Sequence, residues 1–140
     1  MKIYATFALA LLLAGQSALP ARADPARDAI LAGLAAKARA AAPAFAGFSA
    51  ERGKVLFLTR HGGGKPQTPA CATCHTSDPR AMGKTRAGKS IDPMAVSKTP
   101  GRFTDPKKVA KWFRRNCKSV LGRECTPVEK GDFITFMQSR

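Results

Sequence analysis

One five-residue motif, Cys-Ala-Thr-Cys-His at residues 71–75, restricts the possible folds of this chain more than any other feature. Its two cysteines lie on one turn of the chain, and a histidine follows the second directly. This is the attachment signature of haem c: Cys71 and Cys74 can form thioethers with two vinyl groups of one porphyrin, which holds His75 beneath the iron as the proximal ligand. The motif therefore predicts one covalent haem c, which supplies a large apolar plate for the chain to fold around.

Two other uses of a Cys-x-x-Cys pair fit the sequence less well. A thioredoxin-like redox pair lies near a βαβ pattern, and no convincing strand pattern is present here. A zinc site needs a second pair of ligands at suitable spacing, whereas Cys117 and Cys125 are separated by seven residues. We therefore prefer haem attachment to both alternatives.

The first 23 residues have the features of a cleavable secretory signal peptide. Lys2 precedes the apolar run FALALLLAG, and Ala21-Arg22-Ala23 fits a small-residue cleavage site before Asp24. The apolar run is too short to cross a bilayer, which argues against an uncleaved N-terminal anchor. We therefore expect export to the periplasm and no membrane span in the mature chain, residues 24–140.

Helix-start and helix-stop residues predict an all-α protein. Ser49 is a suitable N-cap, as is Thr104 or Asp105 before a later helix. Thr126 and Glu129 form a capping box for the last helix. We expect an N-terminal helical extension over 24–47, followed by one haem domain over 48–140. The expected elements are helices over 25–42, from 50 to the Gly-rich stop at 61–66, over 105–120 and over 127–139, with a long irregular loop over 76–103.

The third expected helix carries an amide on the side that should face the core. At about 100° per residue, Asn116 lies on one stripe with Val109, Phe113 and Val120. A buried Asn needs partners for its polar atoms. We interpret Asn116 as the distal ligand of the iron; the alternative is a core Asn bonded to the backbone or to a haem propionate.

Met94, in the long loop, is the competing distal ligand. Permanent ligation by His75 and Met94 would give a simple electron shuttle, while Met137 is expected to pack in the core. An amide oxygen is a weak, hard donor that suits ferric iron and competes poorly for the softer ferrous ion. Ligation by Asn116 therefore predicts a site that opens on reduction and binds a diatomic gas.

The remaining cysteines form an even pair. With Cys71 and Cys74 used by haem, Cys117 and Cys125 are left over in an oxidising compartment, which favours a disulfide. The alternative is two buried free thiols. The closed loop is short, so the expected stabilisation is roughly 2–3 kcal/mol.

Several stretches resemble one group of class I c-type cytochromes. WFRRNCKSVLGREC, GKSIDPMA, GRFTD and EKGDF, within roughly residues 50–138, are similar to the group typified by the sphaeroides haem protein, which includes relatives described as a domain of unknown function. The resemblance implies a small helical class I fold, Asn116 as a distal ligand released on reduction, and a disulfide between Cys117 and Cys125. It also implies a dihaem cytochrome c and a membrane b-type cytochrome as redox partners, and oxygen or another diatomic gas as ligand.

The charge of the chain is strongly positive and unevenly distributed. The formal net charge is +15, and Arg80 to Arg123 holds thirteen Lys and Arg against Asp92 and Asp105, a net of +11. Such a face either keeps the protein soluble or docks an anionic partner. Export argues against nucleic acid and favours an acidic partner protein or a membrane surface. No acid–base pair or second metal site stands beside the motif, so we expect no enzyme; turnover of oxygen or nitric oxide at an open haem is the alternative.

Overall fold

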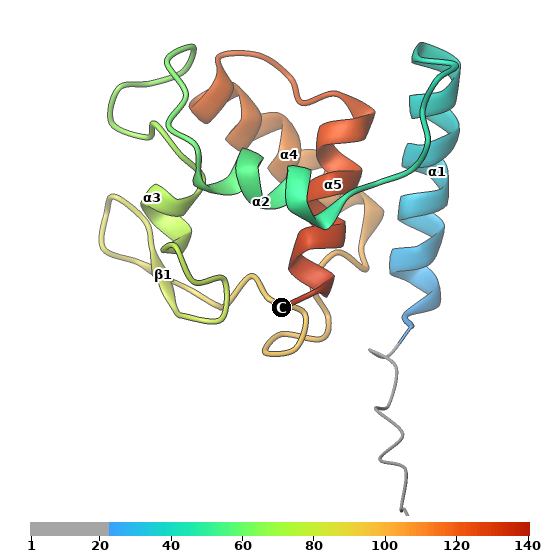
Figure 1. The fold of residues 1–140 in the computed structure, drawn as a ribbon. Helices are drawn as coiled ribbons and strands as arrows, with labels where there is room; N and C mark the ends of the chain where they lie inside the picture. The colour runs from blue at the N-terminus through green and yellow to red at the C-terminus, as the bar shows by residue number, and fades with distance from the viewer. Residues whose placement is uncertain (1–22) are drawn as a thin grey trace, which may run out of the picture.

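The computed structural model describes residues 23–140 and folds them mainly into helices (Figure 1). The predicted signal peptide, residues 1–23, lies outside the described residues except for Ala23. None of the described helices is long and apolar enough to span a membrane. The elements are α1 (Pro25–Ala41), α2 (Ala50–Leu58), α3 (Ala72–His75), β1 (Gly83–Lys84), β2 (Ser90–Ile91), α4 (Pro106–Leu121) and α5 (Pro127–Gln138).

Side-chain caps fix where the longer helices begin, as the sequence predicted. The Ser49 hydroxyl accepts a hydrogen bond from the Arg52 amide at the start of α2. Asp105 accepts one from the Lys108 amide at the start of α4, so Asp105 and not Thr104 is the N-cap. Thr126 and Glu129 form the complete capping box of α5. These caps satisfy amides that have no partner within the helix.

The loop after α3 is irregular, as expected, apart from one small hairpin that was not predicted. Strands β1 and β2 pair antiparallel, with Gly83 opposite Ile91 and Lys84 opposite Ser90. Each strand has two residues, which is too short for an alternating pattern to appear in the sequence. The prediction of an all-α protein is otherwise confirmed.

Helices α2 and α5 make the central contact of the fold. The Gly53 backbone of α2 lies directly against the Asp132 backbone of α5. At the same crossing, the buried Asp132 carboxylate accepts hydrogen bonds from the Ser49 amide at 2.6 Å and from the Arg52 guanidinium at 2.7 and 2.8 Å. A buried carboxylate is tolerated when it is paired in this way. The crossing therefore carries both close packing and a charge pair.

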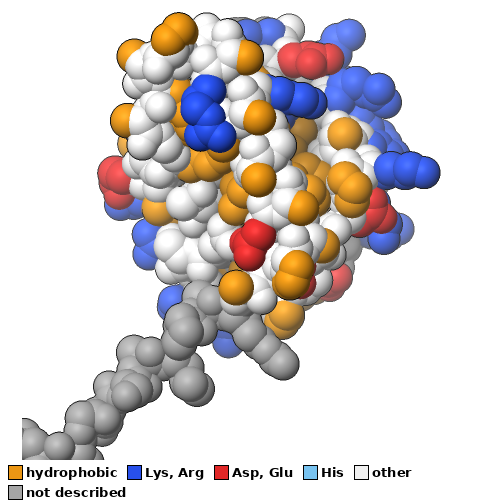
Figure 2. Space-filling view, turned by 90° about the vertical axis from the view of Figure 1, so that its right-hand side faces the viewer, with side chains coloured by type: hydrophobic (Ala, Val, Ile, Leu, Met, Phe, Trp, Pro, Cys, Tyr) orange, Lys and Arg blue, Asp and Glu red, His pale blue; other side chains and the backbone are white. Residues whose placement is uncertain are grey.

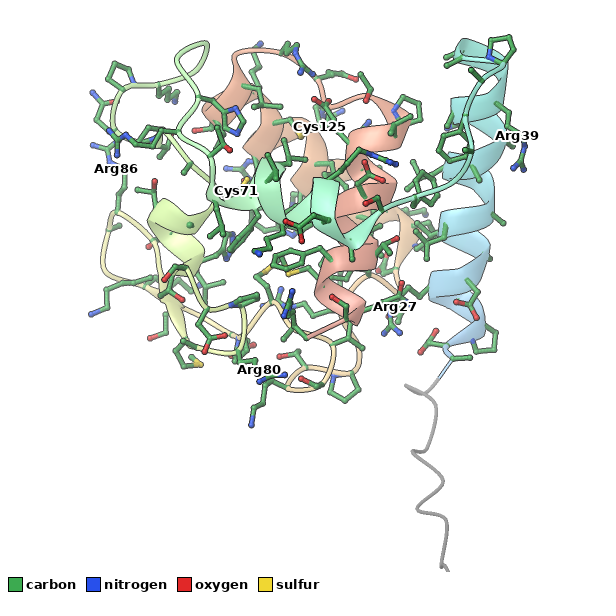
Figure 3. The ribbon with its side chains drawn as sticks, viewed as in Figure 1. Arg27, Arg39, Cys71, Arg80, Arg86 and Cys125 are labelled. Carbon is green, nitrogen blue, oxygen red and sulfur yellow. A yellow bond between two sulfur atoms is a disulfide. The ribbon has the colours of Figure 1, made fainter. Side chains whose placement is uncertain are left out.

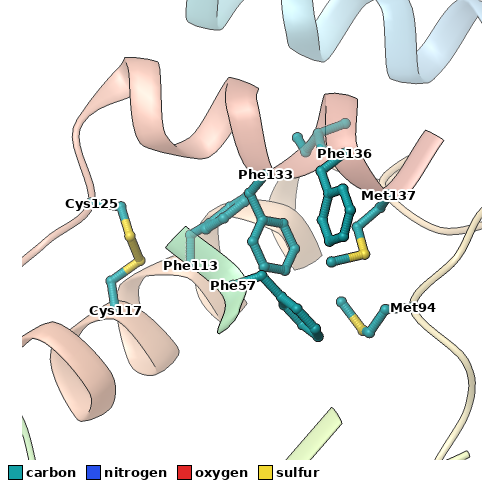
Figure 4. Close-up of a cluster of buried hydrophobic side chains, with 9 residues drawn as sticks. Phe57, Met94, Phe113, Cys117, Cys125, Phe133, Phe136 and Met137 are labelled. Carbon is teal, nitrogen blue, oxygen red and sulfur yellow. A yellow bond between two sulfur atoms is a disulfide. The ribbon is translucent and has the colours of Figure 1, made fainter. Parts of the chain in front are cut away.

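An apolar cluster fills the space between α2, α4 and α5. Phe133 makes edge-to-face contacts with Phe113 and Phe103, at centroid distances of 5.5 and 6.1 Å, and these aromatic pairs stabilise the core. Met137 is completely buried, which agrees with its predicted role in packing. The buried members of the cluster, most of them labelled in Figure 4, are Phe57, Met94, Phe113, Cys117, Cys125, Phe133, Ile134, Phe136 and Met137.

Helix α1 is fastened to the rest of the fold by a buried arginine. Arg27 is 1 % exposed, and its Nε donates to the Arg102 carbonyl at 3.0 Å while its Nη2 donates to the Pro100 carbonyl. Figure 3 shows Arg27 reaching away from α1 towards the rest of the molecule, whereas Arg39 points into solvent. Helix α1 is therefore packed onto the rest of the described chain and holds the turn at 100–102.

Replacing Arg27 by alanine should lower the free energy of unfolding by about 2–4 kcal/mol, because two hydrogen bonds from a charged donor are lost. The measurement is chemical denaturation of the haem-loaded protein. Arg39→Ala is the matched control on the same helix, since Arg39 is exposed. Equal effects of the two substitutions would show that α1 does not hold the 100–102 turn.

Candidate haem site

The Cys-x-x-Cys-His motif forms the short helix α3, as its spacing predicted. The His75 and Cys74 amides both donate to the Cys71 carbonyl, at 3.2 and 3.3 Å, so the two thiols and the imidazole project from one turn. Thr76 then ends the helix with a φ of 61°. Behind it, Gly83 of β1 packs so closely that a Cβ there would meet the Cys74 carbonyl. The small hairpin thus supports α3.

Burial keeps the His75 imidazole neutral. Desolvation, with a smaller effect of the Arg102 charge, lowers the pKa of His75 to about 4. Its Nδ1 atom is buried and has no hydrogen-bond partner within the described part of the chain. A metal-binding imidazole must be neutral, with a lone pair on one nitrogen. The state of His75 fits an axial ligand of haem iron.

The two cysteines of the motif do not have the properties of a redox pair. Both are free thiols, half-buried, in the structure. Burial raises the pKa of Cys71 to about 11, whereas catalytic Cys-x-x-Cys thiols have lowered pKa values. Figure 3 shows Cys71 between α2 and α3, inside the fold. Thiols held here fit thioether bonds to a porphyrin better than thiol–disulfide exchange.

Asn116 does not lie where the core-facing stripe predicted. The buried side of α4 is formed by Phe113, Cys117 and Val120. Asn116 is not covered by other residues of the described chain and is exposed. Asn116 lies about 60° around the helix from Phe113, on the flank that also carries the half-exposed Trp112. The interpretation of Asn116 as enclosed by the protein core is therefore wrong. The amide is instead available to a group outside it.

The end of α4 is held against the segment that leads into the motif. The Ser119 carbonyl accepts hydrogen bonds from the Lys65 amide at 2.7 Å and from the Thr68 hydroxyl at 3.2 Å. The structure joins Cys117 and Cys125 by a disulfide, with Cα atoms 5.5 Å apart. The backbone within one turn of Asn116 is thus held both by the loop before α3 and by the disulfide.

Met94 lies in the apolar cluster, where its side chain is 8 % exposed. Figure 4 shows it beside Met137, at the opposite end of the cluster from the Cys117–Cys125 disulfide. Its neighbour Ala95 donates to the Pro79 carbonyl at 2.9 Å. The Met94 segment is therefore fastened to the chain that follows α3. Asn116 precedes Cys117 and so belongs to the disulfide end of the cluster.

Arg102 is a site residue that sequence reasoning missed. Its Nε and Nη2 donate to the Pro93 and Asp92 carbonyls at 3.1 and 2.6 Å, and its charge contributes to the lowered pKa of His75. Burial lowers the pKa of Arg102 itself. Arg102 thus connects the Met94 segment with the surroundings of His75. Among thirteen Lys and Arg in this region, nothing in the sequence distinguishes it.

The described residues contain no group of three or more His, Cys, Asp or Glu arranged to hold a metal ion by themselves. What they provide is one neutral imidazole, two thiols on the same turn and an adjoining cluster of aromatic and thioether side chains. These features fit a covalently attached porphyrin with one protein nitrogen on its iron. In its fold and site, the chain has the arrangement of a small helical c-type cytochrome.

Comparison with known proteins supports this class. Residues 43–137 match the family described as Domain of unknown function (DUF1924). Cytochrome c-type protein SHP of Cereibacter sphaeroides is 48% identical over 132 residues, which cover 94% of this chain and 95% of that protein. Cytochrome c'' of Methylophilus methylotrophus is 37% identical over 101 residues, covering 71% of this chain and 70% of that protein.

Solved structures agree with the sequence relatives. The structure of oxidized SHP, described as an oxygen-binding cytochrome c, matches with a TM-score of 0.75 at 47% identity, covering 81% of this chain and 96% of that chain. The crystal structure of oxidized cytochrome c'' matches with a TM-score of 0.67 at 32% identity, covering 81% and 93%. The chain belongs to the DUF1924 family of small c-type cytochromes, and haem c is the cofactor of this class. The predicted resemblance and fold class are confirmed.

Proposed function

We propose that this protein is a periplasmic monohaem cytochrome that transfers electrons and binds a diatomic gas when its haem is reduced. Cys71 and Cys74 would hold the haem by thioether bonds, His75 would be the proximal ligand, and Asn116 would be a distal ligand that leaves on reduction. Haem c supplies an iron that changes between ferric and ferrous states and can accept a gas at a free axial position.

The position of the two candidate distal ligands carries this proposal. Either Asn116 or Met94 would supply the second protein ligand of the iron. Hydrogen bonds from the Arg102 side chain to the Pro93 carbonyl and from the Ala95 amide to the Pro79 carbonyl hold the Met94 segment in place. The Met94 side chain is already packed in the apolar cluster beside Met137. Asn116 comes from a different helix, and its amide is exposed. The exposed amide of Asn116 is available to a group outside the core, whereas Met94 is packed within it, and this difference supports Asn116 over Met94 as the distal ligand.

The chemistry of an amide explains why the bond would depend on oxidation state. Its oxygen is a neutral, hard donor, so it binds ferric iron better than ferrous iron. The disulfide between Cys117 and Cys125 limits how far the end of α4 can move. Asn116 would therefore turn away from the iron without unfolding the helix, and would return on oxidation.

Two relatives have descriptions that support such a site. SHP is described as an oxygen-binding cytochrome c. A solution structure of cytochrome c'' is described as giving insights into the structural basis of haem-ligand detachment; it matches this chain with a TM-score of 0.69 at 32% identity. Oxygen binding and haem-ligand detachment are therefore described for proteins similar to this one.

Carbon monoxide tests the open ferrous site directly. The ferrous holoprotein should bind carbon monoxide fully and at a rate that rises linearly with gas concentration, because no strong protein ligand has to be displaced. The measurement is stopped-flow absorption spectroscopy. Incomplete binding, or a rate that reaches a plateau set by ligand dissociation, would favour permanent ligation by His75 and Met94 and an electron shuttle without a gas site.

The electrons would come from or pass to a redox partner protein. The resemblance suggests a dihaem cytochrome c or a membrane b-type cytochrome. The net positive charge of the chain would attract an acidic docking face on such a partner and increase the rate of encounter.

A further inference from the structure

Helix α4 carries a charge pattern that a solubilising surface does not require. It contains six Lys and Arg and no acidic residue in sixteen positions. Arg114 and Lys118 are four residues apart, and so are Lys111 and Arg115. Like charges at this spacing destabilise a helix by roughly 0.2–0.5 kcal/mol per pair. Interaction with the helix dipole explains a cation only near the C-terminus, and Lys118 alone lies in the last turn.

Part of this charge lines a cleft. A cavity of about 640 Å³ lies where α4 ends, and five cations line it: Lys65, Arg114, Arg115, Lys118 and Arg123. The lining also contains one acidic residue, Glu124. Arg123 is already paired with Glu129 at 2.7 Å. Within the described part of the chain, the other four cations form no salt bridge with a carboxylate.

The cleft does not coincide with the side of α4 that faces the core. Arg114 and Lys118 lie about 100° and 140° around the helix from Phe113, away from the flank with Asn116. The space is much larger than one water molecule requires, which is about 30 Å³, and it falls in the range of clefts that accept several groups at once. Figure 2 shows that the cations on the face that carries α1 are densest at its upper right edge, with others in the upper middle, at the left and at the bottom.

We infer that this cleft, lined by Lys65, Arg114, Arg115, Lys118 and Arg123, is the docking site for an acidic segment of the redox partner. Carboxylates from one such segment would give the four free cations the counter-charges that they lack. The partner would then contact the end of α4, next to the loop that the disulfide closes. This inference rests on the proposed electron-transfer function for the nature of the partner, but not on the gas site.

The cations of the cleft come from three parts of the chain: Lys65 from the loop before α3, Arg114, Arg115 and Lys118 from α4, and Arg123 from the loop after α4. The first two of those parts are joined by the hydrogen bond from the Lys65 amide to the Ser119 carbonyl. This hydrogen bond fixes the backbone of Lys65 against the end of α4, so that Lys65 and the cations of α4 lie around one cleft.

Titration of the ferric holoprotein with hexaglutamate at low ionic strength tests the inference. Amide NMR shifts should change at residues 64–65 and 114–124, and calorimetry should give saturable binding. Arg114→Gln/Lys118→Gln should weaken this binding at least tenfold. Lys89→Gln/Lys98→Gln removes the same charge from two exposed positions outside the cleft and should weaken it less than twofold. Circular dichroism of both variants checks that they are folded.

Three results would overturn the inference. Equal weakening in both double variants would mean that the charge acts diffusely. Binding of inorganic phosphate as tightly as hexaglutamate would mean a small-anion site. Shifts centred on other residues would place docking elsewhere. Carbon monoxide binding by the same variants should be unchanged, so a failure of the docking site and a failure of the gas site are measured separately.

Discussion

Replacing Asn116 by alanine should change the absorption spectrum of the ferric protein from that of an amide-ligated haem to that of a water-ligated or five-coordinate, high-spin haem. The substitution removes the only donor oxygen of the side chain. The free energy of unfolding should change little, because Asn116 is exposed. Substitutions at exposed positions usually change this free energy by less than about 0.5 kcal/mol. Ferric absorption and electron paramagnetic resonance spectra measure the coordination.

Met94→Leu is the matched control for Asn116→Ala. Leucine has about the volume of methionine and should fill the same place beside Met137 at a cost of less than about 1.5 kcal/mol. It should leave both the ferric and the ferrous spectra unchanged. A change in distal coordination with Met94→Leu, and none with Asn116→Ala, would establish Met94 as the ligand. Asn116→His should further give a ligand that stays bound to ferrous iron and slows carbon monoxide binding.

The same substitution, glycine to alanine, should have opposite effects in two helices. A Cβ at Gly53 would lie 2.6 Å from the Asp132 carbonyl carbon and 2.8 Å from the Phe136 Cβ. Because these neighbours belong to a packed helix, α2 and α5 would have to move apart. We expect Gly53→Ala to lower the free energy of unfolding by about 3 kcal/mol or more. Chemical denaturation of the holoprotein measures this change.

Gly33 in α1 provides the control, since a Cβ there meets nothing within 4 Å. Gly33→Ala should raise the free energy of unfolding by about 0.5–1 kcal/mol, because alanine loses less backbone entropy in a helix. If both substitutions stabilise the protein, then the close approach of α2 and α5 is not needed for the fold. If both destabilise it, α1 has a contact at Gly33 that the structure does not show.

Local patterns were sufficient to predict most of the helices. Ser49, Asp105 and the Thr126–Glu129 capping box act within three residues of themselves, so the sequence contains all the groups that form these caps. The same reasoning placed the cysteines and histidine of the motif on one turn. It failed for β1 and β2, because their pairing depends on a turn and not on a run of alternating residues.

The direction of each helix face could not be predicted with the same accuracy. Val109, Phe113 and Val120 span about 40° around α4, and Asn116 lies only about 20° beyond Val109. The spacing of these apolar residues therefore does not reveal that the buried side extends towards Cys117 and not towards Asn116. The buried side of α4 includes Cys117, because its disulfide with Cys125 is part of the core. Asn116 is left beside the core instead of within it.

By itself the sequence determined that this chain attaches a haem, where its helices begin, and that its charge is concentrated between Arg80 and Arg123. Each of these depends on residues close together along the chain. Only the tertiary structure decided that Arg102 joins the Met94 segment to the surroundings of His75, and that five cations share one cleft at the end of α4. These depend on contacts between residues far apart in sequence, which form only when α2, α4 and α5 pack together.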